Sequence, residues 1–107
     1  MEMYGRHGSF TAQAGKGQLL ASILLEAAEG LGANPDCHLY VVERTAEEPD
    51  VVSVYEAWTS KEAHAASLQD AGTIELITRA RPLIAGMSEG TEFIPVGGKG
   101  LISRPAD

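Results

Sequence analysis

The chain has 107 residues, of which 44% are hydrophobic and 21% charged, which suits one globular domain and leaves no room for a second core. Its formal net charge of −7 opposes binding to nucleic acid or to an anionic membrane surface, so a small neutral ligand or a protein partner is the more natural target. The sequence predicts a cytoplasmic protein without membrane contact. It has a single cysteine and no visible signal peptide, and no apolar run approaches the roughly 20 residues of a membrane span.

The N-terminal part of the chain predicts a strand followed by an amphipathic helix. Residues 3–12 favour a strand through Tyr4, Phe10 and Thr11. The helix opens at Gly15-Lys16-Gly17 and ends at Gly30 and Gly32. Its apolar stripe recurs at steps of three and four residues and consists of Leu20, Ile23, Leu24, Ala27, Ala28 and Leu31.

Two further strands form a predicted hairpin. Residues 37–45 have an apolar centre at 39–42, and residues 51–59 form the second strand. The polar residues 46–50 between them are typical of a turn, so we expect the two strands to pair in antiparallel fashion.

Helices dominate the next part of the sequence. Thr59 or Ser60 is the expected N-cap of a helix that Gly72 ends, and residues 73–84 predict another helix, which ends or kinks before Pro82. Residues 92–96 are the last predicted strand, at a sheet edge because of Pro95. Residues 97–107 read as a flexible C-terminal tail that packs on a partner subunit.

The order strand, helix, strand, strand, helix, helix, strand predicts an α+β, ferredoxin-like fold. Its four-stranded antiparallel sheet has helices on one face. The other face is left uncovered, and Tyr55 and Val41 are among the residues able to point there. We therefore expect a homodimer that buries two sheets face to face.

Three side chains around the end of the second hairpin strand are candidate functional residues. Glu56 and Trp58 alternate, so they share a strand face, and His64 lies one turn into the following helix. A histidine titrates near neutral pH and can accept a phenolic proton. The structural alternatives are a core tryptophan, a carboxylate paired with Arg6 or Arg44, and a histidine bonded to a carbonyl or to Glu56.

Tyr40 is a further candidate, because its hydroxyl can hydrogen-bond a substrate oxygen; the alternative is core packing. No metal site is expected, since His7 and His38 lack ligand spacing and no Cys/His cluster exists.

The motifs resemble the antibiotic biosynthesis monooxygenase family. An early strand ends in the turn Ala14-Gly15-Lys16-Gly17. Residues 35–40, Pro-Asp-Cys-His-Leu-Tyr, are close to the family's Pro-Gly-Cys-x-x-Tyr, and residues 56–63 resemble its Glu-x-Trp-x-Ser-x-Glu-Ala. The resemblance extends from Met3 to about Pro95, so residues 1–96 are the predicted family domain.

This resemblance implies a dimeric α/β barrel that oxidises quinols or polycyclic phenols with molecular oxygen and without metal, flavin or haem. Many members have a histidine nine residues after the tryptophan, where this chain has Ser67, and Gly72 lies in the region where a second histidine often follows. His64, on the same helix face, is the expected catalytic residue. The expected substrate-binding residues, for a small aromatic molecule, are Trp58, Glu56, Tyr40, Ser67 and Leu68.

Other functions fit the sequence less well. The haem-degrading members of the family use Asn, Trp and His, where this chain offers Gly8, Ser67 and Ile77. An RNA-binding ferredoxin-like module would need basic charge and a stacking motif that are absent from the sequence. A non-catalytic dimeric domain that binds a small hydrophobic ligand remains the alternative, because one fold hosts both activities.

Overall fold

The computed structural model describes residues 2–101 of the chain. Its elements follow one another as β1 (Tyr4–Ala12), α1 (Gly17–Gly30), β2 (Cys37–Arg44), β3 (Val51–Trp58), α2 (Lys61–Ser67), α3 (Ala71–Ala80), β4 (Ile84–Met87) and β5 (Thr91–Phe93). Short 3-10 turns at Leu31–Ala33 and Arg81–Leu83 follow α1 and α3. None of the described helices is long and apolar enough to cross a membrane.

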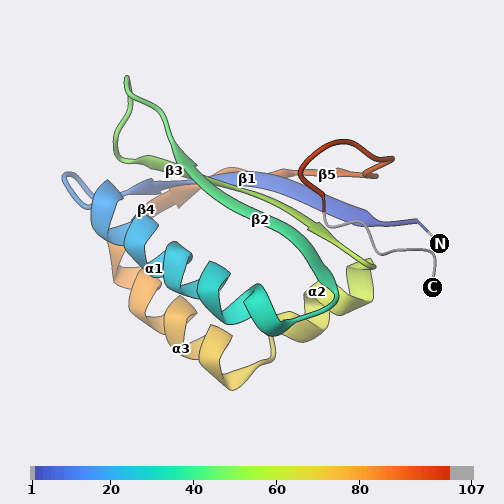
Figure 1. Cartoon of the computed structure of the whole chain (residues 1–107). Coiled ribbons are helices and arrows are strands. Elements are labelled where there is room, and N and C mark those ends of the chain that lie inside the picture. Colours follow the sequence, from blue (N-terminus) through green and yellow to red (C-terminus); the bar gives the residue numbers. More distant parts are fainter. Residues whose placement is uncertain (1, 102–107) are drawn as a thin grey trace.

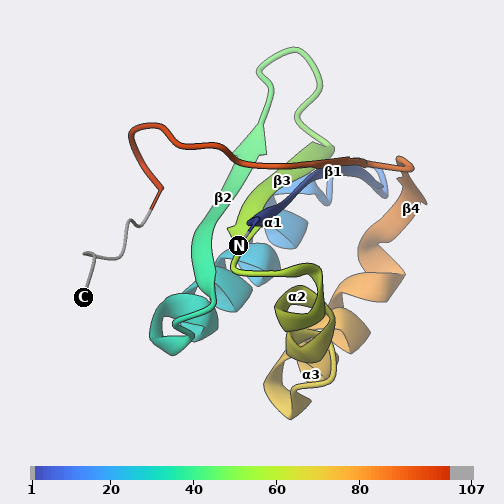
Figure 2. The same cartoon turned by 90° about the vertical axis from the view of Figure 1, so that its right-hand side faces the viewer.

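The strands form one antiparallel sheet in the order β2-β3-β1-β4, and β5 also pairs with β1. All three α-helices lie on one face of this sheet (Figures 1 and 2). The fold is therefore the expected α+β, ferredoxin-like one, and the hairpin of β2 and β3 is confirmed.

Strand register places the chemistry-bearing side chains on the helix-covered face. Arg6 of β1 lies opposite Glu56 of β3, which lies opposite Tyr40 of β2. The neighbouring row consists of His7, Tyr55 and Val41. Because side chains alternate along a strand, this second row points to the outer face, where Tyr55 is 40% and Val41 44% exposed.

Two clusters of buried side chains hold the layers together. The first joins α1 to the sheet and to α3 and contains Ala12, Leu20, Ile23, Val52 and Ala80. The second joins the starts of β1 and β2 to the end of β3 and contains Tyr4, Cys37 and Trp58. Trp58 is 1% exposed, so it is a core residue as well as a candidate site residue.

Side-chain caps define where α2 and α3 begin. The Ser60 hydroxyl accepts a hydrogen bond from the Ala63 amide at 3.1 Å, which identifies Ser60 as the cap of α2. The Asp70 carboxylate accepts bonds from the amides of Gly72 and Thr73 and caps α3. Gly72 therefore lies inside the first turn of α3. The prediction that it ends the preceding helix was wrong, because Asp70 starts a new helix before it.

The sheet has one strand more than predicted. Residues 84–87 form β4, paired with β1, where the sequence predicted that the helix reached Ile84. The helix ends at Ala80, which confirms the predicted end before Pro82, and the tight turn Arg81–Leu83 follows. The last strand is Thr91–Phe93 rather than 92–96, since Pro95 has no N–H to donate. The predicted flexible tail covers residues 97–107, of which 102–107 lie outside the described residues. The tail and its packing on a partner subunit stay a prediction.

One carboxylate fixes the start of α1 against the β2–β3 turn. The Asp50 side chain accepts hydrogen bonds from the amides of Gly15 at 2.9 Å and Gly17 at 2.8 Å. These bonds lower the pKa of Asp50. A Cβ atom on Gly17 would lie 2.2 Å from the carbonyl oxygen of Pro49, so only glycine allows this close approach.

Candidate active site

A cavity of about 490 Å³ lies between the sheet and the helices. Its wall is mainly apolar and includes Leu20, Ile23, Leu24, Leu76, Ile77 and Met87. Its polar lining includes Arg6, Tyr40, Glu56, Trp58, His64 and Ser67. An apolar cavity with a few convergent polar groups is the usual form of a small-molecule site.

All six residues predicted from the sequence line this cavity: His64, Trp58, Glu56, Tyr40, Ser67 and Leu68. Glu56 and Trp58 come from β3, and Tyr40 comes from β2. His64 and Ser67 lie on α2, and Leu68 follows directly and is 41% exposed. The structure thus brings the predicted residues together in one cavity wall.

Glu56, Trp58 and His64 form a connected group in the cavity wall. The indole N–H of Trp58 donates a hydrogen bond to Glu56 Oε1 at 2.8 Å. His64 Nε2 lies 3.7 Å from the same oxygen, and both side chains are only 13% exposed. The His64 ring contacts the Trp58 ring edge-on, with ring centres 5.6 Å apart. The nearest partners of Glu56 are therefore Trp58 and His64. The pairing with Arg6 or Arg44 that the sequence also allowed is not formed within residues 2–101.

Burial favours the uncharged form of the imidazole. It lowers the pKa of His64, and the positive charge of Arg6 lowers it further. Burial also raises the pKa of the Glu56 carboxyl, which the Trp58 N–H and Arg6 partly oppose. A neutral imidazole beside a buried carboxyl can accept a proton and have the resulting charge stabilised.

Two of the hydroxyl groups in the wall, those of Ser67 and Tyr40, differ in their availability. The Ser67 hydroxyl donates to the His64 carbonyl oxygen at 2.6 Å, which holds it against its own helix. The Tyr40 hydroxyl makes no hydrogen bond within residues 2–101, and burial raises its pKa well above the usual range. Tyr40 therefore keeps its proton and can donate it to a ligand in the cavity.

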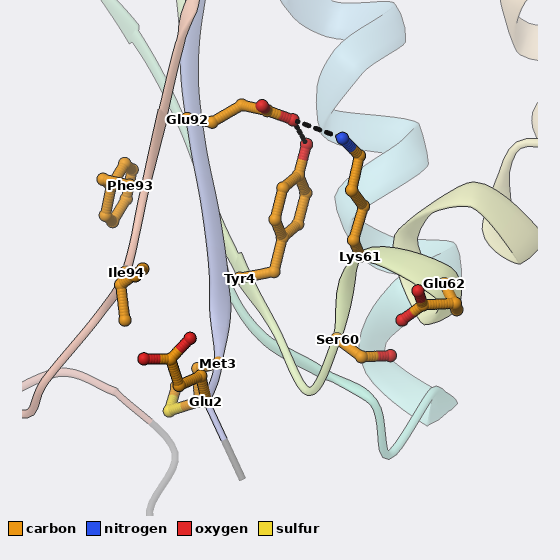
Figure 3. A pocket seen from close by; sticks show the side chains of 9 residues that line it. All are labelled: Glu2, Met3, Tyr4, Ser60, Lys61, Glu62, Glu92, Phe93 and Ile94. Carbon is orange, nitrogen blue, oxygen red and sulfur yellow. Dashed lines mark hydrogen bonds and ion pairs between the residues drawn. The ribbon is translucent and has the colours of Figure 1, made fainter.

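A second, larger depression lies outside the cavity, where α2 begins beside β1 and β5 (Figure 3). In it, the Tyr4 hydroxyl donates to Glu92 Oε2 at 2.5 Å, and Lys61 Nζ lies 3.4 Å from the same oxygen. These charges are paired and half exposed or more, whereas the cavity holds the buried titratable groups. The cavity is therefore the candidate active site.

The sequence did not place Arg6 in the site, although it is part of the cavity wall. It was considered only as a partner for Glu56, and the structure puts it directly opposite Glu56 in the pairing of β1 with β3. No sequence motif marks it, because the register between two strands that are distant in the sequence is set by the fold. Among residues 2–101, no three His, Cys, Asp or Glu side chains gather as a metal site would require.

Comparisons with known proteins identify the family of this chain. The family model described as antibiotic biosynthesis monooxygenase matches residues 3–73. The chain belongs to the antibiotic biosynthesis monooxygenase family. A solved structure of a candidate member of that family from Chloroflexus aurantiacus is 39% identical, with a TM-score of 0.83, over 92% of this chain and 98% of the other.

More distant solved structures share the fold. A candidate antibiotic biosynthesis monooxygenase from Nitrosomonas europaea is 16% identical, with a TM-score of 0.81, over 88% of this chain and 90% of that one. SnoaB, a cofactor-independent oxygenase from Streptomyces nogalater, is 17% identical, with a TM-score of 0.76, over 92% and 98% of the two chains. Among curated proteins, none matches the sequence.

Proposed function

We propose that this family member is a cofactor-independent monooxygenase that oxidises a quinol or polycyclic phenol with molecular oxygen. The observation that carries the proposal is the buried imidazole of His64, which lies beside the Glu56 carboxyl in the wall of an apolar cavity of about 490 Å³. SnoaB, which shares the fold, is described as a cofactor-independent oxygenase, and this description supports the same chemistry here.

The reaction balances without an added reductant. In an anthrone-type substrate, one atom of O₂ becomes the new carbonyl oxygen, and the other leaves as water with two hydrogens from the substrate. All electrons come from the substrate, once loss of a proton has made it electron-rich. The protein has to orient the substrate, exclude water and accept that proton.

The cavity residues divide these tasks. His64 accepts the proton, and the imidazolium forms 3.7 Å from Glu56 Oε1. The Tyr40 hydroxyl donates to a second substrate oxygen, while Trp58 closes the wall behind the imidazole. Leu68 contacts the substrate at the exposed rim, and Ser67 keeps His64 and its helix turn in place.

Oxygen uptake tests this function. Purified protein is incubated with a panel of naphthohydroquinones and anthrones, and O₂ consumption is followed with an electrode beside protein-free samples. We expect uptake well above the protein-free rate for at least one polycyclic substrate, with one O₂ consumed per product formed. Uptake equal to the protein-free rate across the panel would contradict a catalytic function.

A non-catalytic ligand-binding domain is the second candidate. It is favoured by the mainly apolar cavity wall and by the Ser67 hydroxyl, which is already bonded to the His64 carbonyl. In that case the panel molecules bind, as equilibrium dialysis would show, and no oxygen is consumed.

We also propose that the protein is a homodimer joined through the outer face of its sheet. This face carries the exposed Tyr55 and Val41, and Tyr55 contacts the rings of His7 and Phe93 there. Exposed apolar and aromatic side chains that lie together on one face are typical of a protein interface.

Mass in solution tests the dimer. Light scattering at micromolar concentration should give twice the mass of the 11.3 kDa chain. Tyr55→Glu should give a monomer, because it buries a charge in the interface. Leu25→Glu, on an exposed position of α1, is the matched control and should stay dimeric. A monomeric wild-type protein would exclude the proposed interface.

A further inference from the structure

Arg6 places a positive charge at the polar end of the cavity. It extends from β1, the central strand, and lies opposite Glu56 in the sheet register. No ion pair joins Arg6 and Glu56 in the described part of the chain, because the Glu56 carboxyl is turned toward Trp58 and His64. The guanidinium therefore faces the cavity without a carboxylate bound to it on that side.

Only one nitrogen of the Arg6 guanidinium, Nη1, interacts with Tyr4 and Glu92. Arg6 Nη1 donates to the Tyr4 hydroxyl at 3.1 Å and lies 3.8 Å from Glu92 Oε2. Glu92 Oε2 is closer to the Tyr4 hydroxyl, at 2.5 Å, and to Lys61 Nζ, at 3.4 Å; Figure 3 draws these two contacts. One carboxylate therefore interacts with two cations, Lys61 and Arg6. The group formed by Arg6, Lys61 and Glu92 thus keeps one positive charge.

The rest of the guanidinium is available to a ligand. Its hydrogen bonds within residues 2–101 use Nη1 alone, and an arginine has four further N–H donors. Nη2 lies beside Gly90, within ordinary van der Waals range (3.7 Å) of the position that a Cβ atom would take there. Gly90 and Arg6 both line the cavity, so this end of the guanidinium lies at the cavity wall.

We propose that Arg6 binds the substrate oxygen from which His64 removes the proton, so that the cavity selects phenols and quinols that bind as oxyanions. This inference rests on the proposed monooxygenase function and names a residue and a substrate class for it. Arginine suits the task, because its planar fork of N–H donors remains charged at every working pH.

The charges balance on both sides of the proton transfer. Before transfer, the substrate hydroxyl and His64 are neutral, and Arg6 is positive near Glu56. Afterwards, the O–H bond is broken, the proton is on the imidazole and the electron pair stays on the substrate oxygen. The imidazolium is then paired with Glu56 and the oxyanion with Arg6, so no charge in the cavity lacks an opposite partner.

The test measures ionisation of a bound phenol without any turnover. The probe is 4-nitro-1-naphthol, a bicyclic phenol whose absorbance changes when it ionises. We titrate it free in solution and bound to wild-type protein. Because an opposite charge close to a group typically shifts its pKa by 1–3 units, we expect the pKa of the bound probe to be at least about one unit below that of the free probe.

Arg6→Gln should abolish this lowering while keeping a long polar side chain. Arg44→Gln is the matched control, since it removes the same charge from an exposed position outside the cavity, and it should titrate like wild type. Circular dichroism shows whether each variant is folded. If Arg6→Gln does not fold, the comparison of free and bound probe with wild-type protein still decides the matter.

Three results would overturn the inference: a wild-type protein that does not bind the probe, a bound probe that ionises no more easily than the free one, or a folded Arg6→Gln protein that titrates like wild type. Each of these is independent of oxygen uptake. The oxygen-electrode measurement therefore tests the monooxygenase function, and the titration of the bound probe tests the role of Arg6.

Discussion

Replacing His64 with alanine is expected to lower the rate of oxygen uptake by about 10²–10⁴-fold, the usual contribution of a positioned general base. The imidazole is the titratable group that burial keeps uncharged in the cavity wall, with a carboxyl oxygen 3.7 Å from Nε2 to stabilise the protonated form. Alanine removes the imidazole and leaves the rest of the cavity wall, including Glu56, in place. The initial rate of O₂ consumption with the best panel substrate measures the effect.

The pH profile separates a base from a structural histidine. Burial and Arg6 lower the pKa of His64 below its usual value of about 6.5, so the base form predominates at neutral pH. The rate should fall as the pH drops through that lowered pKa, and this acid limb should be missing in His64→Ala. Glu62→Ala, on the same helix, is the control and should keep both rate and limb. An unchanged rate in a folded His64→Ala protein would refute the proposed role.

Trp58→Ala is expected to destabilise the protein by about 3–5 kcal/mol, as typical for removal of a buried aromatic ring. Trp58 is 1% exposed and packs in the cluster with Tyr4 and Cys37. Its loss also leaves Glu56 without the indole N–H donor. Since small domains are stable by only about 5–15 kcal/mol, the variant should be close to unfolding at room temperature. Urea unfolding followed by circular dichroism measures the change.

Two further variants separate the loss of the aromatic ring from the loss of the indole hydrogen bond. Trp58→Phe keeps an aromatic ring and removes the N–H donor, so its loss should be nearer the roughly 1–3 kcal/mol of an unsatisfied buried polar group. Leu25→Ala removes an exposed apolar side chain from α1 and should stay within about 0.5 kcal/mol of wild type. A loss below about 1 kcal/mol in Trp58→Ala would show that the second buried cluster contributes little to stability.

The sequence predicted the long periodic elements and missed the short ones. The stripe of α1 and the hairpin of β2 and β3 contain enough apolar positions to show their period. β4 has four residues, including Gly86, and follows directly on the stripe of α3, so its first residue read as the end of that helix. Its pairing with β1 is a tertiary contact that no local pattern contains.

In the candidate site, too, the sequence predicted the residues that local patterns place and missed the one that strand pairing places. Glu56 and Trp58 were placed on one face by strand alternation, and His64 was placed inward by helix periodicity, because both are local rules. Arg6 and its distance from Glu92 depend on the pairing of β1 with β3 and β5. Such register between distant strands is decided by the packing of the whole sheet, so the sequence could offer Arg6 only as one of two partners for Glu56.

The central place of β1 in the sheet also determines when the molecule can finish folding. β1 is the first of these strands to be synthesised, yet its partners, β3 on one edge and β4 and β5 on the other, begin at Val51, Ile84 and Thr91. The hairpin of β2 and β3 can form from nearby residues, whereas both edges of β1 stay open until much later segments arrive. Until then the nascent chain carries an unpaired strand, which is the type of edge that other chains can pair with. Because of this strand order, both edges of β1 are covered only after the last quarter of the chain, which contains β4 and β5, has been synthesised.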